Sequence, residues 1–188
     1  MRWFERTWSF DLPASGFPAL LERLRSTPAR MAELIVGATD DQLRRHDPGA
    51  WSAKRHLGHL DDLHALDSRR LDEFSAGSPT LTPADPTNRL TWETDHDATP
   101  AEAIIARFRG HREELVAQME RLSEAQISAT SMHPRLGRPM RLIDWAYFVA
   151  EHDDHHLAAA RQALTKSGFA SREPLGGWGD PLPPKGVA

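Results

Sequence analysis

Cysteine is absent from the 188 residues of this chain. Its absence excludes disulfide bonds, thiolate metal ligands and a cysteine nucleophile. A bound metal would therefore be held by imidazole, carboxylate or backbone oxygen, and any thiol chemistry would need a thiol supplied from outside. Histidine, in contrast, is plentiful, with ten residues.

Long apolar runs and an excess of basic charge are also missing. No apolar run approaches the ~20 residues that a membrane-spanning helix needs, and the N-terminal sequence lacks the apolar region of a signal peptide. The formal net charge is −4 and no basic stripe stands out, so we expect no nucleic-acid partner. We expect a cytoplasmic protein without a membrane partner, whose 39% hydrophobic and 27% charged residues suit a globular domain.

Capping residues, prolines and glycines divide the chain into helices. A short helical turn over 17–24 is expected to stop near Ser26, and Thr27 with Pro28 predicts the start of a second helix that reaches Val36. The remaining segments are a short turn after residue 39, helices over about 53–76, 100–122 and 139–166, and long connections over 78–98 and 123–138. No strand is predicted.

This pattern predicts an all-α fold, a four-helix bundle with long crossover connections, in which metal sites form between facing helices. We expect the bundle domain to cover residues 1–170. Residues 171–188, rich in glycine and proline, are expected to form a C-terminal tail.

Three histidines are expected to face the core of this bundle. On a helical wheel, His59 falls within the apolar arc of the helix over 53–76. His152 and His156 fall within the apolar arc of the last helix, four residues apart and therefore on one face. Burying three neutral imidazoles without partners is costly, and a divalent metal ion would accept their lone pairs.

An ordinary structural role remains open for the same residues. His152 and His156 could be core histidines bonded to Asp67, Asp153 and backbone carbonyls. His56 is interpreted as a group beside the ligands or a helix cap rather than as a ligand. The other histidines in loops or on mixed faces are expected to be solvated, namely His46, His96, His111 and His133.

Two short motifs in this order suggest a family. Trp51-Ser52 is followed by His59-Leu60, and the segment from Arg138 to Asp144 runs into the motif HDDHH over residues 152–156. Over residues 15–166 the chain resembles the DinB-like metal-binding four-helix proteins.

The resemblance implies a bundle with a right-handed crossover arrangement, often dimeric, with a metal held by His59, His152 and His156. It also implies a small-molecule substrate, because the best-understood relatives are transferases or isomerases that use bacillithiol, mycothiol or glutathione. His64 stands where the resemblance leads us to expect a glutamate, a departure that concerns the surroundings of the metal and the substrate.

Three functions follow as hypotheses. Zn²⁺ or Ni²⁺ with an open coordination position could activate an external thiol, giving a thiol S-transferase in which Asp153 and Asp67 orient the imidazoles. The same ion could activate water in a hydrolase, with Asp62, Asp67 or Asp153 as general base. The third hypothesis is a non-catalytic, stress-related metal-binding protein in which the ion ties helices together.

Overall fold

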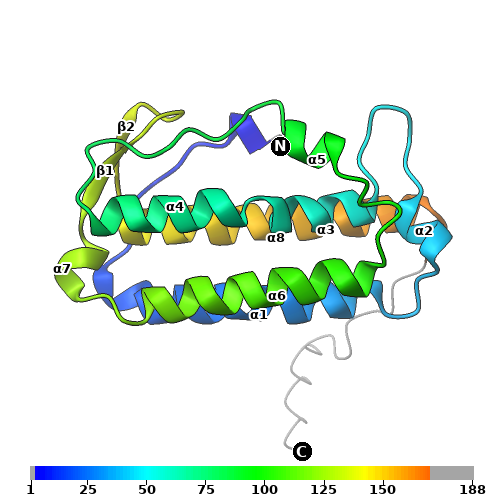
Figure 1. Ribbon diagram of the computed structural model, residues 1–188, viewed down its shortest axis with the longest axis horizontal. Helices are drawn as coiled ribbons and strands as arrows, with labels where there is room; N and C mark the ends of the chain where they lie inside the picture. Colours follow the sequence, from blue (N-terminus) through cyan, green and yellow to red (C-terminus); the bar gives the residue numbers. More distant parts are fainter. Residues whose placement is uncertain (1–2, 170–188) are drawn as a thin grey trace, which may run out of the picture.

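Four long helical segments, within residues 3–169 that the computed structural model describes, form a bundle (Figure 1). The segments are α1 (Phe17–Ile35), α3 (Ala53–Asp62) continued by α4 (His64–Ser75), α6 (Ala101–Met119) and α8 (Leu142–Lys166). The all-α four-helix bundle predicted from the sequence is confirmed. The predicted tail over 171–188 lies outside the described residues.

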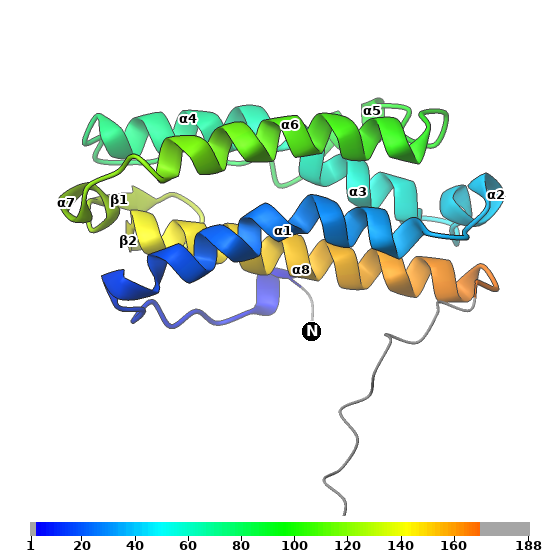
Figure 2. The same cartoon turned by 90° about the horizontal axis from the view of Figure 1, so that it is seen from below.

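Each long segment packs on two neighbours. Helix α1 contacts α6 and α8, and α3 contacts the same two helices from the opposite corner. Figures 1 and 2 show that α1 runs parallel to α8, and that α3–α4 runs parallel to α6. The connection from α4 to α6 must therefore return along the whole bundle, which explains its length.

Helix α1 differs from the two segments expected here, because it is continuous from residue 17 to 35 with Pro28 inside it. Proline in a helix interior costs about 3 kcal/mol, since it lacks the N–H that would bond the carbonyl four residues earlier. Leu24 and Met31, on either side of Pro28, are both fully buried. Tertiary packing of this face outweighs the local cost, so the break expected near Ser26 does not occur.

A β-hairpin corrects the prediction that the chain has no strand. Strand β1 (Thr130–His133) pairs antiparallel with β2 (Arg138–Arg141) just before α8. Its buried positions are Ser131 and His133, whereas Met132 is exposed. In this inverted pattern the polar side chains are buried and the apolar one is exposed, so hydrophobic alternation does not predict the strand.

Short helices occupy several connections. Helix α2 (Asp40–Arg44) begins with a capping box at Thr39, as expected. Helix α5 (Arg89–Glu93) lies within the segment predicted to be loop, and α7 (Glu124–Ile127) follows α6. The 3-10 turns η1 (Trp3–Glu5) and η2 (Ala14–Gly16) precede α1. None of the helices within residues 3–169 combines the length and apolar character needed to cross a lipid bilayer.

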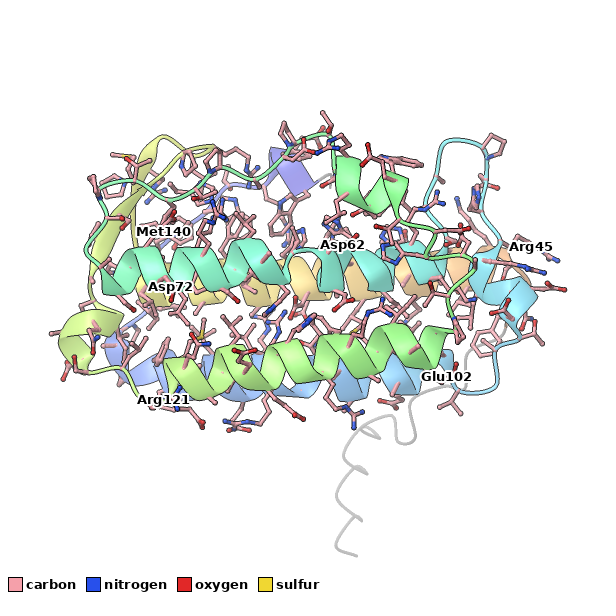
Figure 3. The ribbon with its side chains drawn as sticks, viewed as in Figure 1. Arg45, Asp62, Asp72, Glu102, Arg121 and Met140 are labelled. Atoms are coloured by element: carbon pink, nitrogen blue, oxygen red, sulfur yellow. The ribbon has the colours of Figure 1, made fainter. Side chains whose placement is uncertain are left out.

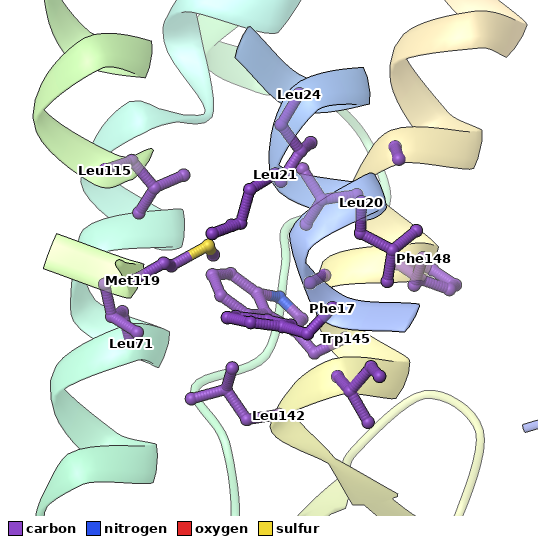
Figure 4. Packing of buried hydrophobic residues seen from close by; sticks show 14 of the residues in the cluster. Phe17, Leu20, Leu21, Leu24, Leu71, Leu115, Met119, Leu142, Trp145 and Phe148 are labelled. Carbon is purple, nitrogen blue, oxygen red and sulfur yellow. The ribbon is translucent and has the colours of Figure 1, made fainter. Parts of the chain in front are cut away.

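The apolar core is divided into two clusters. One gathers around Trp145, Met119 and Leu142 at the end of the bundle next to the hairpin (Figure 4). The other gathers around Met31, Leu57 and related residues at the end next to α2. Between them lies a layer of buried polar side chains, one from each long segment: Thr27, Asp67, Arg112 and Asp153. This polar layer borders the functional site.

Candidate functional site

His59, His152 and His156 come together across the interface of α3 and α8. Each offers one ligand atom, and these three atoms all lie within 4.8 Å of one another. The Nε2 atoms of His152 and His156 are 3.2 Å apart. The spacing of four residues places both rings on one face of α8, and the packing of α3 on α8 brings the third ring to them.

The three rings are neutral at pH 7. Burial and the neighbouring histidines hold the pKa of His59 at about 4. For the same reasons the pKa values of His152 and His156 lie well below the usual value of an imidazole. Neutral imidazoles present lone pairs, which is the state that metal coordination requires.

The spacing of the two nitrogen atoms on α8 fits one small divalent ion. Two Zn–N bonds of about 2.0–2.1 Å at a tetrahedral angle place their nitrogens about 3.3 Å apart. The Nε2 separation of 3.2 Å between His152 and His156 agrees with this value. Three imidazoles leave a coordination position free for water or substrate, as in catalytic zinc sites.

Thr91 fixes the proton on the far nitrogen of His59. The Thr91 hydroxyl donates to Asp62 at 2.8 Å, so its oxygen must accept from Nδ1 of His59 at 2.9 Å. Asp62, at the end of α3 (Figure 3), also accepts from Nε2 of His96 at 2.9 Å. The proton held on Nδ1 leaves Nε2 of His59 as the lone pair that faces the other histidines.

His56 takes the corresponding position behind His156. Their Nδ1 atoms are 3.0 Å apart, so one ring donates and the other accepts. When Nε2 of His156 serves as a ligand, its Nδ1 carries the proton and His56 accepts it. Burial holds the pKa of His56 at about 4, which keeps this ring an acceptor at pH 7.

The aspartates expected to orient the imidazoles have other contacts. Asp153 accepts hydrogen bonds from Thr27 at 2.8 Å and from Arg112 at 3.0 Å. Asp67 is buried, faces the same polar layer and lines the cavity described below. Burial raises the pKa of Asp67 to about 6, against the attraction of Arg112. Both carboxyl groups lie close to the site, but the hydrogen bonds found for the histidines go elsewhere.

Aromatic rings cover the histidines on two sides. The Trp51 ring lies 5.0 Å from the ring of His59 and 5.8 Å from that of His156. The Trp3 ring meets that of His152 edge-on at 4.8 Å. These rings shield the histidines from bulk water, which strengthens electrostatic interactions within the site.

A cavity of about 830 Å³ opens beside the three histidines. Its walls come from α3, α4, α6 and α8, and from η1, the connection after α4 and the hairpin. The lining residues include Trp3, Phe4, Trp51, His56, Leu60, Leu63, Leu66, Asp67, Arg70, Pro83, Arg112, His133, Arg135, Phe148, Val149 and His155. Its volume suits a small organic ligand.

Two histidines expected to be solvated are buried. His96 is 0% exposed and His133 is 2% exposed. His111 is partly exposed and stacks on His64, with ring centres 3.7 Å apart, while His46 is exposed as expected. The role of Thr91 is not predictable from the sequence, because a connection without periodicity carries no signal of where its side chains point.

Comparison with solved structures identifies the same bundle in other proteins. The fold resembles that of YfiT from Bacillus subtilis, described as a probable metal-dependent hydrolase with an unusual four-helix bundle topology. The TM-score is 0.75 at 19% identity, covering 88% of this chain and 95% of that one. A mycothiol-dependent maleylpyruvate isomerase gives a TM-score of 0.62 at 13% identity, covering 82% of this chain and 63% of that one.

Sequence comparison identifies the family. No curated protein matches the chain. The DinB superfamily matches residues 23–160, which is more than half of the chain and includes the three clustered histidines. The resemblance noted in the sequence is thereby confirmed, and this protein belongs to the DinB superfamily.

Proposed function

We propose that this protein is a metal-dependent enzyme in which His59, His152 and His156 hold one divalent ion, zinc or nickel. The observation that carries the proposal is the convergence of three neutral imidazoles on the wall of a cavity of about 830 Å³. An ion that only tied helices together would need no cavity of this size. The description of YfiT as a probable metal-dependent hydrolase supports the same chemistry.

The reaction proposed is transfer of a low-molecular-weight thiol to a small electrophile. A metal ion at this site would lower the pKa of a bound thiol and supply a thiolate at neutral pH. The new sulfur–carbon bond forms as the leaving group departs with its electron pair. The absence of cysteine agrees with an external thiol such as bacillithiol, mycothiol or glutathione, and one structural neighbour is mycothiol-dependent.

The protein's own groups would prepare this step. Thr91 and His56 hold the protons on the far sides of two of the histidines, so that the inward nitrogens keep their lone pairs. Trp3 and Trp51 exclude water around them, and the cavity receives the electrophile. The proposal assumes the cytoplasm, where such thiols are kept reduced.

Hydrolysis is the second candidate, favoured by Asp67. This carboxyl group lines the cavity, and its pKa of about 6 lies near the operating pH expected of a general base. Water would then replace the thiol as nucleophile, with Asp67 taking its proton. Turnover that needs no thiol and is lost in Asp67→Asn would select this reaction.

Metal content tests the shared part of both reactions. Tag-free protein, purified without nickel, should contain about one metal ion per chain, and His152→Ala should lose it. His155→Ala is the matched control, because this neighbour on α8 also lines the cavity but lies outside the three-histidine cluster. Wild-type protein that remains metal-free and folded, and takes up neither zinc nor nickel, would overturn the proposal.

Turnover separates the two reactions. The metal-loaded protein is mixed with an electrophile such as 1-chloro-2,4-dinitrobenzene and, in turn, with bacillithiol, mycothiol or glutathione. Thiol-dependent product formation that disappears in His152→Ala and persists in His46→Ala, a change at an exposed histidine that does not line the cavity, supports transfer. If none of the three thiols gives product with any of a panel of electrophiles, the result contradicts thiol transfer.

A further inference from the structure

The cavity has a second polar end, which the proposed metal chemistry does not use. Arg70, Arg112, His133 and Arg135 line it. They come from α4, α6, the first hairpin strand and the turn that follows that strand. The hairpin stands at the end of the bundle where α8 begins (Figure 1). Four groups that donate hydrogen bonds thus line one cavity from three separate parts of the chain.

His133 presents a hydrogen-bond donor that has no acceptor. Its Nδ1 accepts from the backbone N–H of Leu136 at 3.3 Å, so the neutral ring carries its proton on Nε2. That Nε2 is buried and has no partner within residues 3–169. Buried donors are almost always paired, so this donor on the cavity wall is available to a molecule that enters the cavity.

Arg112 presents a second such donor. Its side chain is 3% exposed, and its Nη2 is committed to Asp153 at 3.0 Å. Its Nη1 is buried and has no partner in the part of the chain that the structure describes. Arg70 gives its Nε and Nη2 to the carbonyl of Thr82 at 3.0 and 2.8 Å, which fixes the direction of its guanidinium group.

Arg135 is held in place without a carboxylate partner. It forms no ion pair with any residue between 3 and 169. Its guanidinium carbon lies 5.0 Å from the ring centre of Phe4 and 5.4 Å from that of Phe148. Cation–π contacts position a guanidinium group and leave its N–H donors available to an anion.

The charge balance at this end favours an anion with a single charge. Three guanidinium groups, those of Arg70, Arg112 and Arg135, face two interior carboxyl groups, Asp67 and Asp153. Among these lining groups one positive charge remains; Glu73, whose charge also acts on Arg70, lies outside the cavity and accepts hydrogen bonds from Thr82. A further carboxylate on the lining, that of Asp85, is exposed and accepts hydrogen bonds from the backbone N–H groups of Thr87 and Arg89. A carboxylate of a small acid would neutralise the remaining charge, whereas a phosphate dianion would exceed it.

This end lies within reach of the three histidines. The ring centres of His133 and Phe148 are 5.4 Å apart. Phe148 precedes His152 by four residues, a rise of about 6 Å along α8, so the two polar ends are at most roughly 11 Å apart. An acid of a few carbon atoms can span that distance.

We propose that Arg70, Arg112, His133 and Arg135 bind the carboxylate of a small organic acid and direct its other end toward the three histidines. The anion site stands on its own observations; that the acid is a substrate rests on the proposed function. The carboxylate belongs either to the electrophile or to the thiol.

Binding of butyrate tests the site, with uncharged butyramide of the same shape as control. Titrations followed by ¹H–¹⁵N spectra use both zinc-loaded and EDTA-treated protein, so that binding to the metal is separated from binding to the arginines. We expect saturable binding of butyrate in both forms and none of butyramide. Arg135→Gln and His133→Phe should each weaken it about tenfold or more.

Arg138→Gln is the matched control variant. Arg138 lies on the second hairpin strand, bonds the carbonyl of Trp8 and does not line the cavity, so its loss should change butyrate affinity less than twofold. Equal effects of the Arg135 and Arg138 variants would overturn the proposal, as would tighter binding of inorganic phosphate than of butyrate. If His133→Phe fails to fold, the butyrate affinity of Arg135→Gln still tests the site, because Arg135 is exposed and its replacement should not prevent folding.

Two further experiments show whether the carboxylate belongs to the thiol or to the electrophile. Competition of glutathione, but not its diethyl ester, with butyrate on EDTA-treated protein assigns the site to the thiol. A raised KM for a carboxylated electrophile in Arg135→Gln, with an unchanged KM for the thiol, assigns it to the electrophile. Protein that binds butyrate but no metal would keep this site and remove the proposed function; the reverse result would remove only the site.

Discussion

The ring of His96 lies directly over the backbone of Gly58, so closely that a methyl group on Gly58 would overlap three atoms of the ring. His96 reaches Asp62 from this position. Glycine at residue 58 therefore makes room for the connection that carries both His96 and Thr91 to the histidine cluster.

Gly58→Ala should consequently lower the free energy of unfolding, by about 1–3 kcal/mol as for other overpacked sites. Gly110→Ala is the control, because Gly110 also lies in a helix but has open space around the added methyl group. That change should stabilise by about 0.5–1 kcal/mol through helix propensity. Urea denaturation measures both, and a stabilised Gly58→Ala variant would contradict the described contact.

Thr91→Val should weaken zinc binding about tenfold or more, because it removes the acceptor that holds the proton on Nδ1 of His59. Thr91→Ser keeps the hydroxyl group and should bind zinc within about threefold of wild type. Competition with a fluorescent zinc chelator measures the affinities. Equal zinc affinities of the valine and serine variants would show that the Thr91 hydroxyl group does not support metal binding.

Asp153→Ala should lower the free energy of unfolding by about 3–5 kcal/mol, because it leaves Arg112 charged and buried without its partner. Arg89→Ala removes an exposed pair with Glu93 and should cost less than about 0.5 kcal/mol. The double variant Asp153→Leu with Arg112→Met should recover much of the loss. A double variant no more stable than Asp153→Ala would show that the unpaired charge of Arg112 does not cause the loss of stability.

The metal-free protein should lose stability as the pH falls from about 6.5 toward 4. His56, His59 and His133 have pKa values of about 4 in the folded state, below the ordinary 6.5 of the unfolded chain. In this window the unfolded chain binds more protons, and each such histidine lowers stability by up to about 1.4 kcal/mol per pH unit. His152 and His156, also depressed, add to this loss.

Asp67 works in the opposite direction. Its folded pKa of about 6 exceeds the ordinary 3.8, so its protonation favours the folded state as the pH falls below about 6. Burial also raises the pKa of Asp153, so two carboxyl groups oppose the five histidines, and the net effect remains a loss. Urea denaturation of EDTA-treated protein at several pH values measures it. Constant stability between pH 7 and 4.5 would exclude the buried neutral histidines.

The sequence predicted the parts of the site that lie on long helices. Spacing on an apolar arc indicated that His59, His152 and His156 face the core, and the structure brings them together. Their role as ligands stays a prediction, as does the homodimer implied by the resemblance, which light scattering would check. The positions of Thr91, His96 and His133 depend on tertiary packing of irregular connections, and no local pattern encodes it.

The same difference between local pattern and tertiary packing explains the errors in the predicted fold. The local preference of Pro28 predicts the start of a helix, and the burial of Leu24 and Met31 overrides that preference. Strand β1 buries His133 on the cavity wall and Ser131 against the carbonyl of Ser78, which its hydroxyl group bonds, so neither position follows the pattern of an apolar core. Local propensity fails at the positions where packing or a site imposes another requirement.

The hairpin has a consequence for how such a protein can diversify. The three clustered histidines belong to the long helices, whereas His133 and Arg135 belong to a short excursion outside them. Changes at the exposed and cavity-lining positions of that excursion can alter which molecules the cavity admits. The bundle keeps its stability and its histidine cluster as long as Met140 of β2 stays in the core. One scaffold can in this way acquire new substrates through changes in a dozen peripheral residues or so, without redesign of its core.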